Sequence, residues 1–187
     1  CNPGQDHHRP GPHMRFTATL EHRTFFSKNR YIELDELLSP EHVALLQKEL
    51  DTTLIERLKK PLNSATTLEM FQMGYDMWRT NDTVKKYVFK NTFTQIAAVL
   101  LKSHLLRIAY DQYITPAGQE APLTEILSLS QLSYFKPLAG ACLIRLSDEP
   151  ILNGIDQSQC PLPSKAGHVV FLSPDFLIHW DQLFALQ

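Results

Sequence analysis

The pattern of apolar residues changes character about halfway along the chain. In the first half, apolar residues recur at intervals of three and four, which predicts an amphipathic helix of about five turns. These residues are Val43, Leu46, Leu50, Leu54 and Leu58. Ser39 and Pro40 precede them and are typical of a helix start. After Pro116 the apolar runs are short and are separated by proline and glycine, which is typical of strands. We therefore expect an α+β fold in which helices pack on an antiparallel sheet or barrel.

The same patterns predict the individual elements. We expect a strand at 31–34, a packed loop over 62–81, a helix from Asn81 or Asp82 through Lys90, and a second helix from Asn91 or Thr92 through Lys102. Further strands are expected at 105–114, 141–146 and 169–172. Residues 14–187 then form one domain, mainly helical over 14–104 and mainly strand over 105–187. Residues 1–13 are polar and irregular, and we interpret them as a leader left by cloning.

The amino-acid composition limits the classes of function that we expect for this chain. The chain has 187 residues, of which 43% are hydrophobic, and a formal net charge of -2. The basic residues are spread along the sequence, so nucleic acid is an unlikely partner. No apolar run reaches the length of roughly 18 residues that a membrane span needs, so we expect a cytoplasmic protein with no membrane partner. The three cysteines show no paired spacing, and Cys142, inside an apolar run, is expected to be a small buried hydrophobe.

Several local strings, in their order along the chain, resemble the phytanoyl-CoA dioxygenase-like branch of the iron(II)- and 2-oxoglutarate-dependent oxygenases. The matching strings are a short strand before the helix start at 38–41, a tryptophan–arginine pair at 78–79, a Tyr-Asp-Gln strand at 110–112, and the strand pair of 167–179 that ends in a histidine. The resemblance covers nearly all of residues 14–187. It implies a double-stranded β-helix core, also described as jelly-roll or cupin-like, with N-terminal helices packed on it.

The resemblance also locates the positions of the iron ligands. It implies that His179 is the distal histidine, and that the His-x-Asp pair of the family falls at Leu129 and Gln131. Leucine has no lone pair, and a neutral amide is a poor replacement for a carboxylate on iron. The family also holds the cosubstrate with an arginine beyond the distal histidine, whereas no arginine follows Arg145 here. Arg107 and Arg145 are weak alternatives for that role.

Other readings of the candidate residues remain open. His168 could join His179 at a metal, with Asp175 or Asp181 as a third ligand, although a hydrogen-bonded strand histidine is the more common role. Asp111 is expected to be a structural hydrogen-bond acceptor. The neighbouring Tyr134 and Phe135 could stack on a ligand, but a rim aromatic pair is favoured.

We therefore predict a non-catalytic binding or regulatory module, a pseudoenzyme with an oxygenase-like fold that lacks the metal-binding triad. No metal or cofactor is expected, and the partner is an unidentified small molecule or protein. One alternative is a divergent oxygenase that uses iron and 2-oxoglutarate with ligands from elsewhere in the chain. Another is a metal-responsive transcriptional regulator, against which the acidic balance and the lack of paired cysteines argue.

Overall fold

A computed structural model describes residues 18–35, 37–103, 105–115, 126–128, 138–148 and 165–179. Helices dominate the first part and short strands the second. The elements are α1 (Leu20–Asn29), β1 (Tyr31–Leu34), α2 (Pro40–Leu58), η1 (Leu62–Ser64), α3 (Thr67–Met73), η2 (Met77–Arg79), α4 (Asp82–Val88), α5 (Asn91–Leu100), β2 (Ile126–Ser128), β3 (Ala141–Ile144), β4 (Val169–Leu172) and β5 (Leu177–His179). Among the described residues, no helix is long and apolar enough to cross a membrane.

The long helix α2 confirms the prediction made from its apolar spacing. It begins at Pro40 after Ser39, whose side chain accepts a hydrogen bond from the backbone N–H of His42. It ends at Leu58, and Lys59 then takes a left-handed conformation with φ of 56°. The buried face contains Val43, Leu46, Leu50, Thr53 and Leu54. The elements that follow α2 therefore pack against this buried face.

The prediction of a loop over 62–81 is wrong. That stretch contains α3 between two single turns of 3-10 helix, η1 and η2. A capping box starts α3: the Thr66 side chain accepts from the Glu69 N–H, and the Glu69 carboxylate accepts from the Thr66 N–H. A helix of seven residues is too short to display an apolar period, so only the cap could have revealed it.

The two helices predicted after residue 81 are present, but each is slightly shorter than expected. The side chain of Asn81 caps α4 by accepting from the N–H groups of Thr83 and Val84. Helix α5 starts at Asn91 and ends at Leu100. In contrast, the strand expected over 105–114 is not formed, because the described residues there have a single bridge, from Gln112 to Tyr75.

The described strands form two antiparallel sheets. One has three strands in the order β1-β4-β3, with Ile32 opposite Phe171 and Phe171 opposite Cys142. The other pairs β2 with β5 and places Ile126 opposite His179. The strands at 31–34 and 169–172 match the prediction, and β3 covers the first part of the strand expected at 141–146. The double-stranded β-helix stays a prediction, because residues 116–125, 129–137 and 149–164 lie outside the described part of the chain.

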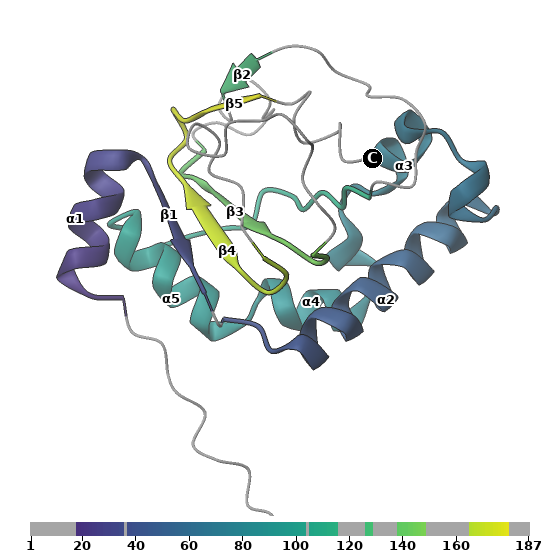
Figure 1. Cartoon of the computed structure of the whole chain (residues 1–187), viewed down its shortest axis with the longest axis horizontal. Coiled ribbons are helices and arrows are strands. Elements are labelled where there is room, and N and C mark those ends of the chain that lie inside the picture. The colour runs from purple at the N-terminus through teal and green to yellow at the C-terminus, as the bar shows by residue number, and fades with distance from the viewer. Residues whose placement is uncertain are drawn as a thin grey trace, which may run out of the picture.

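The two faces of the three-stranded sheet have different neighbours. One face packs against α1, α2 and α5, where the buried cluster includes Phe26, Val43, Phe93, Ile96, Val169 and Phe171. In Figure 1, α1, α5 and α2 follow one another from the left of the sheet round to its lower right, and the β2–β5 pair lies above the sheet. The other face contains Val170 and Leu172, with Phe71, Ile114 and Phe176 packed on it. Helices α1, α2 and α5 thus cover one face, while Phe71 of α3 packs on the other.

Cys142 has only part of the buried environment that the sequence predicts. Its side chain is accessible to solvent, although it lies directly across the ladder from the buried Phe171 and desolvation raises the pKa of its thiol to about 12. Among the described strands, β3 pairs with β4 alone. The apolar run correctly predicted a strand, but a run of this kind does not show how much of each side chain is accessible to solvent.

Candidate functional site: a structural clasp and a charged sheet rim

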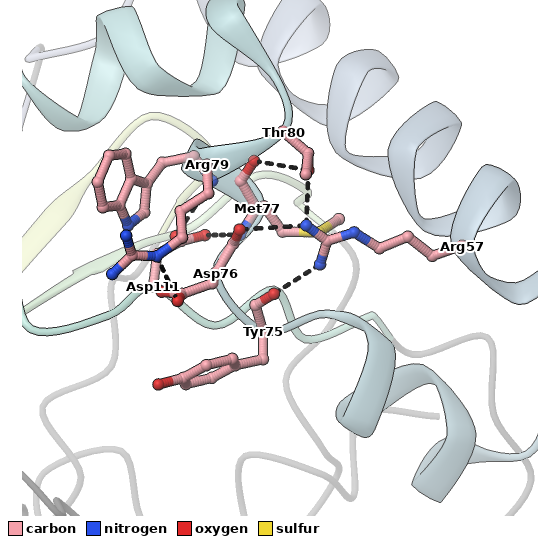
Figure 2. Close-up of polar contacts among 8 residues, drawn as sticks. Arg57, Tyr75, Asp76, Met77, Arg79, Thr80 and Asp111 are labelled. Carbon is pink, nitrogen blue, oxygen red and sulfur yellow. Dashed lines mark hydrogen bonds and ion pairs between the residues drawn. The ribbon is translucent and has the colours of Figure 1, made fainter.

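The polar residues of the helical part meet at Arg57, in the last turn of α2. Its Nη1 atom donates to the carbonyl oxygens of Met73 at 2.9 Å and Tyr75 at 2.5 Å. Its Nη2 atom donates to the carbonyl oxygen of Asp76 at 3.1 Å and to Oγ1 of Thr80 at 2.6 Å. One guanidinium therefore ties the end of α3 and the 75–80 turn to α2. Figure 2 shows Arg57 beside Tyr75, Asp76 and Thr80 of that turn.

Asp111 supports the same turn from the opposite side. Its carboxylate oxygens accept from the backbone N–H groups of Met77 at 3.1 Å and Trp78 at 3.2 Å, and its carbonyl accepts from the Asp76 N–H at 2.9 Å. Burial raises the pKa of Asp111, and this effect outweighs the two amide hydrogen bonds that lower it. The expectation of a structural acceptor is confirmed.

The side chains of the turn also bind one another. Asp76, which has a left-handed backbone with φ of 53°, accepts from Arg79 Nε at 2.6 Å. The guanidinium of Arg79 lies 4.5 Å from the centre of the Trp78 ring, a cation–π contact. We call the set Arg57, Asp76, Arg79, Thr80 and Asp111 the Arg57 clasp. The contacts of Arg57 and Asp111 are mainly to the main chain, so the role that the clasp supports is to hold the fold.

A second polar group lies at one end of the three-stranded sheet. His168, just before β4, and Glu33, in β1, are joined by a contact of 2.9 Å between Nδ1 and Oε1. The side chains are 22% and 33% exposed, so both are partly shielded from water.

Arg145 completes this group from the strand on the other side. Its N–H donates to the His168 carbonyl at 3.2 Å, which continues the β3–β4 ladder by one residue. Its side chain donates from Nε to the Ser147 carbonyl at 2.6 Å. Burial lowers the pKa of Arg145, while the carboxylates of Asp148 and Glu33 act in the opposite direction. We call Glu33, His168 and Arg145 the sheet rim.

The backbone before β4 holds the rim in place. Gly167 donates to the Arg145 carbonyl at 2.9 Å and has φ of 86°, a conformation that favours glycine. A Cβ atom there would lie 2.7 Å from the carbonyl oxygen of Leu38. The tight turn therefore places His168 at the start of its strand, and any larger residue at position 167 would displace it.

The rim lies at the end of an apolar surface. Opposite residues of an antiparallel ladder share a face, and the face alternates along each strand. Glu33, Val170 and Leu143 form one such row, and His168 and Arg145 lie two residues further along their strands. Val170 and Leu172 of this face are buried. The charged residues of the rim therefore lie at one end of the sheet face that is opposite α1, α2 and α5.

The histidines that could have shared a metal lie in different sheets. His168 belongs to the three-stranded sheet, whereas His179 is the last residue of β5 in the two-stranded sheet. The candidate third ligand Asp175 accepts from the Ser173 hydroxyl and forms an ion pair with Arg30 at 3.1 Å. Over the described ranges, no three His, Cys, Asp or Glu residues are grouped as a metal site would require.

Some of the other site residues predicted from the sequence lie in the part of the chain that the structure describes, and others lie outside it. Leu129, Gln131, Asp181 and the pair at 134–135 lie outside the described residues. Arg107 is exposed in the extended segment 105–115, and Arg145 belongs to the sheet rim. Sequence reasoning missed Arg57 and Glu33 entirely. No local pattern identifies either residue, because their partners are 16 or more positions away along the chain.

Comparison with known proteins identifies no family for this chain. No protein-family model, no curated protein and no solved structure matches this chain. The resemblance to iron- and 2-oxoglutarate-dependent oxygenases therefore stays a prediction from the sequence motifs.

Proposed function

We propose that this protein is a non-catalytic binding or regulatory module whose ligand contacts the sheet rim. The observation that carries the proposal is the grouping of Glu33, His168 and Arg145 at the end of an otherwise apolar sheet face. Withdrawing ionisable groups from water costs free energy, and such sites are enriched where ligands bind. The rim offers an anionic group, a cationic group and an imidazole within one small area.

The chemistry of the rim favours binding over catalysis. A carboxylate–imidazole pair can position a proton, but an acyl-transfer site also needs a nucleophile next to the base. Cys142 is not that nucleophile, because it alternates onto the opposite face of the sheet from Leu143 and His168. The positions that the family resemblance aligns with the iron ligands, Leu129 and Gln131, carry side chains that are unsuited to iron. Both considerations support a module that recognises a polar head group attached to an apolar body.

A binding screen with rim variants tests this assignment. The probes are 2-oxoglutarate, succinate, glutamate and putrescine, which present anionic, zwitterionic and cationic head groups. Binding is measured by calorimetry with the native chain and with Glu33→Gln, His168→Gln and Arg145→Gln, which preserve size and polarity. Lys165→Gln is the matched control, because Lys165 is exposed and lies three residues before His168.

The expected result is that at least one probe binds saturably, is recovered unchanged, and loses about tenfold in affinity or more in a rim variant while the control is unaffected. Conversion of a bound probe would contradict the non-catalytic part of the proposal. The absence of binding by every probe, or equal binding by the rim variants, would remove the rim as the ligand site.

A further inference from the structure

An open hollow of about 430 Å³ lies beside the outer face of α1 and is completed by a residue that follows α5. Its lining residues are Leu20, Arg23, Thr24, Ser27, Lys28 and Lys102. Three of these six are cations, and none is a carboxylate. The hollow therefore concentrates positive charge in a chain whose net charge is -2.

The three cations of the hollow lie around one space without a counter-ion, in contrast to three other cations of the described chain. Arg30, Lys60 and Arg79 each form an ion pair, with Asp175, Glu69 and Asp76 respectively. Within the described ranges, Arg23, Lys28 and Lys102 form no ion pair and no side-chain hydrogen bond. Like charges around one hollow repel one another, and an anion that binds between them relieves that repulsion.

Two packed helices hold these groups in position. Arg23 and Ser27 lie four residues apart on one row of α1, and Leu20, Thr24 and Lys28 form the adjacent row. Lys102 comes from the turn after α5, where its φ of 51° is left-handed and the N–H of Leu101 closes the helix on Ala97. Because α1 and α5 pack together through a shared core, the cations are presented by a rigid scaffold.

The geometry points to a phosphate group as the ligand. A single carboxylate would balance one of the three cations, whereas a phosphate near neutral pH has close to two negative charges and several acceptor oxygens. We propose that the hollow formed by Arg23, Lys28 and Lys102 binds a phosphate-bearing ligand. Leu20 is 74% exposed at its margin, so the phosphate can belong either to a soluble molecule or to a lipid head group.

This site is separate from the sheet rim. The hollow lies on the outer surface of α1, whereas the rim belongs to the sheet face that turns away from α1, α2 and α5. The two assignments can therefore fail or hold independently.

The first experiment titrates inorganic pyrophosphate into the isotope-labelled chain and follows the backbone amides of residues 20–28 and 102 by NMR. The hollow variant combines Arg23→Gln, Lys28→Gln and Lys102→Gln. The control variant combines Arg107→Gln, Lys85→Gln and Lys86→Gln, which removes the same numbers of arginines and lysines from exposed positions elsewhere. We expect saturable shifts at α1, about tenfold weaker binding or more in the hollow variant, and a change of less than about twofold in the control.

The second experiment distinguishes the two sources of phosphate. Flotation is measured with phosphatidylcholine vesicles that contain or lack phosphatidic acid. Binding to pyrophosphate alone indicates a soluble ligand, and binding to the acidic vesicles alone indicates a lipid head group. Either result supports the site if the hollow variant loses it and the control keeps it. If neither probe binds, or if the two variants weaken binding equally, the proposal is overturned.

A single substitution keeps the test decisive if the triple variant does not fold. Lys102→Gln changes one exposed side chain that lies after the end of α5. It is expected to weaken binding of the responsive probe by about threefold, as a partly screened surface charge would. Unchanged affinity in this variant would overturn the role of Lys102 and, with it, the three-cation site.

Discussion

The Arg57 clasp and the sheet rim use charged residues in opposite ways. In the clasp, Arg57 and Asp111 bind mainly the backbone groups of a single turn. In the rim, Glu33 and His168 contact each other across two strands, next to Arg145. Charged side chains that satisfy the backbone fix a fold, because backbone groups left without a partner are costly. Charged side chains that contact one another while partly solvated add little stability.

The largest effect that this comparison predicts is the loss of Arg57. Replacing it with methionine preserves most of the volume but removes four hydrogen bonds to the 73–80 segment. We expect the free energy of unfolding, measured in urea, to fall by about 2–3 kcal/mol. Arg107→Met is the matched control, since Arg107 is exposed, and should change stability by less than about 0.5 kcal/mol. Equal effects of the two substitutions would show that the clasp does not hold the fold.

Asp111→Asn should have the next largest effect. An amide side chain has one acceptor oxygen, so it can satisfy either the Met77 N–H or the Trp78 N–H but places a donor against the other. We expect a loss of about 1–2 kcal/mol in the same urea assay. A variant as stable as the native chain would mean that solvent replaces one of these hydrogen bonds.

The sequence predicted the parts of the fold that depend on local patterns. The period of Val43, Leu46 and Leu50 and the cap at Ser39 correctly located α2. The clasp was not predictable, because Arg57 binds carbonyl groups whose position depends on the turn between α3 and α4. The rim was not predictable for a similar reason, since Glu33 and His168 are 135 residues apart and meet only through strand pairing. Likewise, the apolar run around Cys142 indicated a strand but not the solvent accessibility of this side chain.

A smaller effect on stability is expected from a change at the start of α3. This helix ends at Met73, whose carbonyl group accepts a hydrogen bond from Arg57 of the clasp. The Lys60 ammonium, and then the N–H and hydroxyl of Thr66, lower the pKa of Glu69 from 4.5 to about 2. The pKa of Glu69 is lower in the folded chain than in the unfolded chain. The contribution of ionised Glu69 to folding stability is therefore complete above pH 4.5 and is lost as the pH falls towards 2. Melting temperatures of the native chain and Glu69→Gln should therefore differ most near neutral pH and converge at about pH 2. A constant difference across this range would contradict the assigned ion pair.

The smallest expected effect on stability belongs to the rim. His168→Gln and Glu33→Gln should each change the free energy of unfolding by less than about 0.5 kcal/mol, because both side chains are partly solvated. The same variants are expected to impair ligand binding. If instead either one destabilises the protein as strongly as Arg57→Met, the rim is a second structural clasp and the comparison fails.

We propose that this chain binds a ligand without iron-dependent chemistry. The most direct measurement is iron content together with succinate release, after anaerobic loading with iron(II) and exposure to 2-oxoglutarate and oxygen. We predict iron well below one atom per chain and succinate release no faster than in a His179→Ala variant. One iron per chain, with succinate release that disappears in His179→Ala, would contradict the claim.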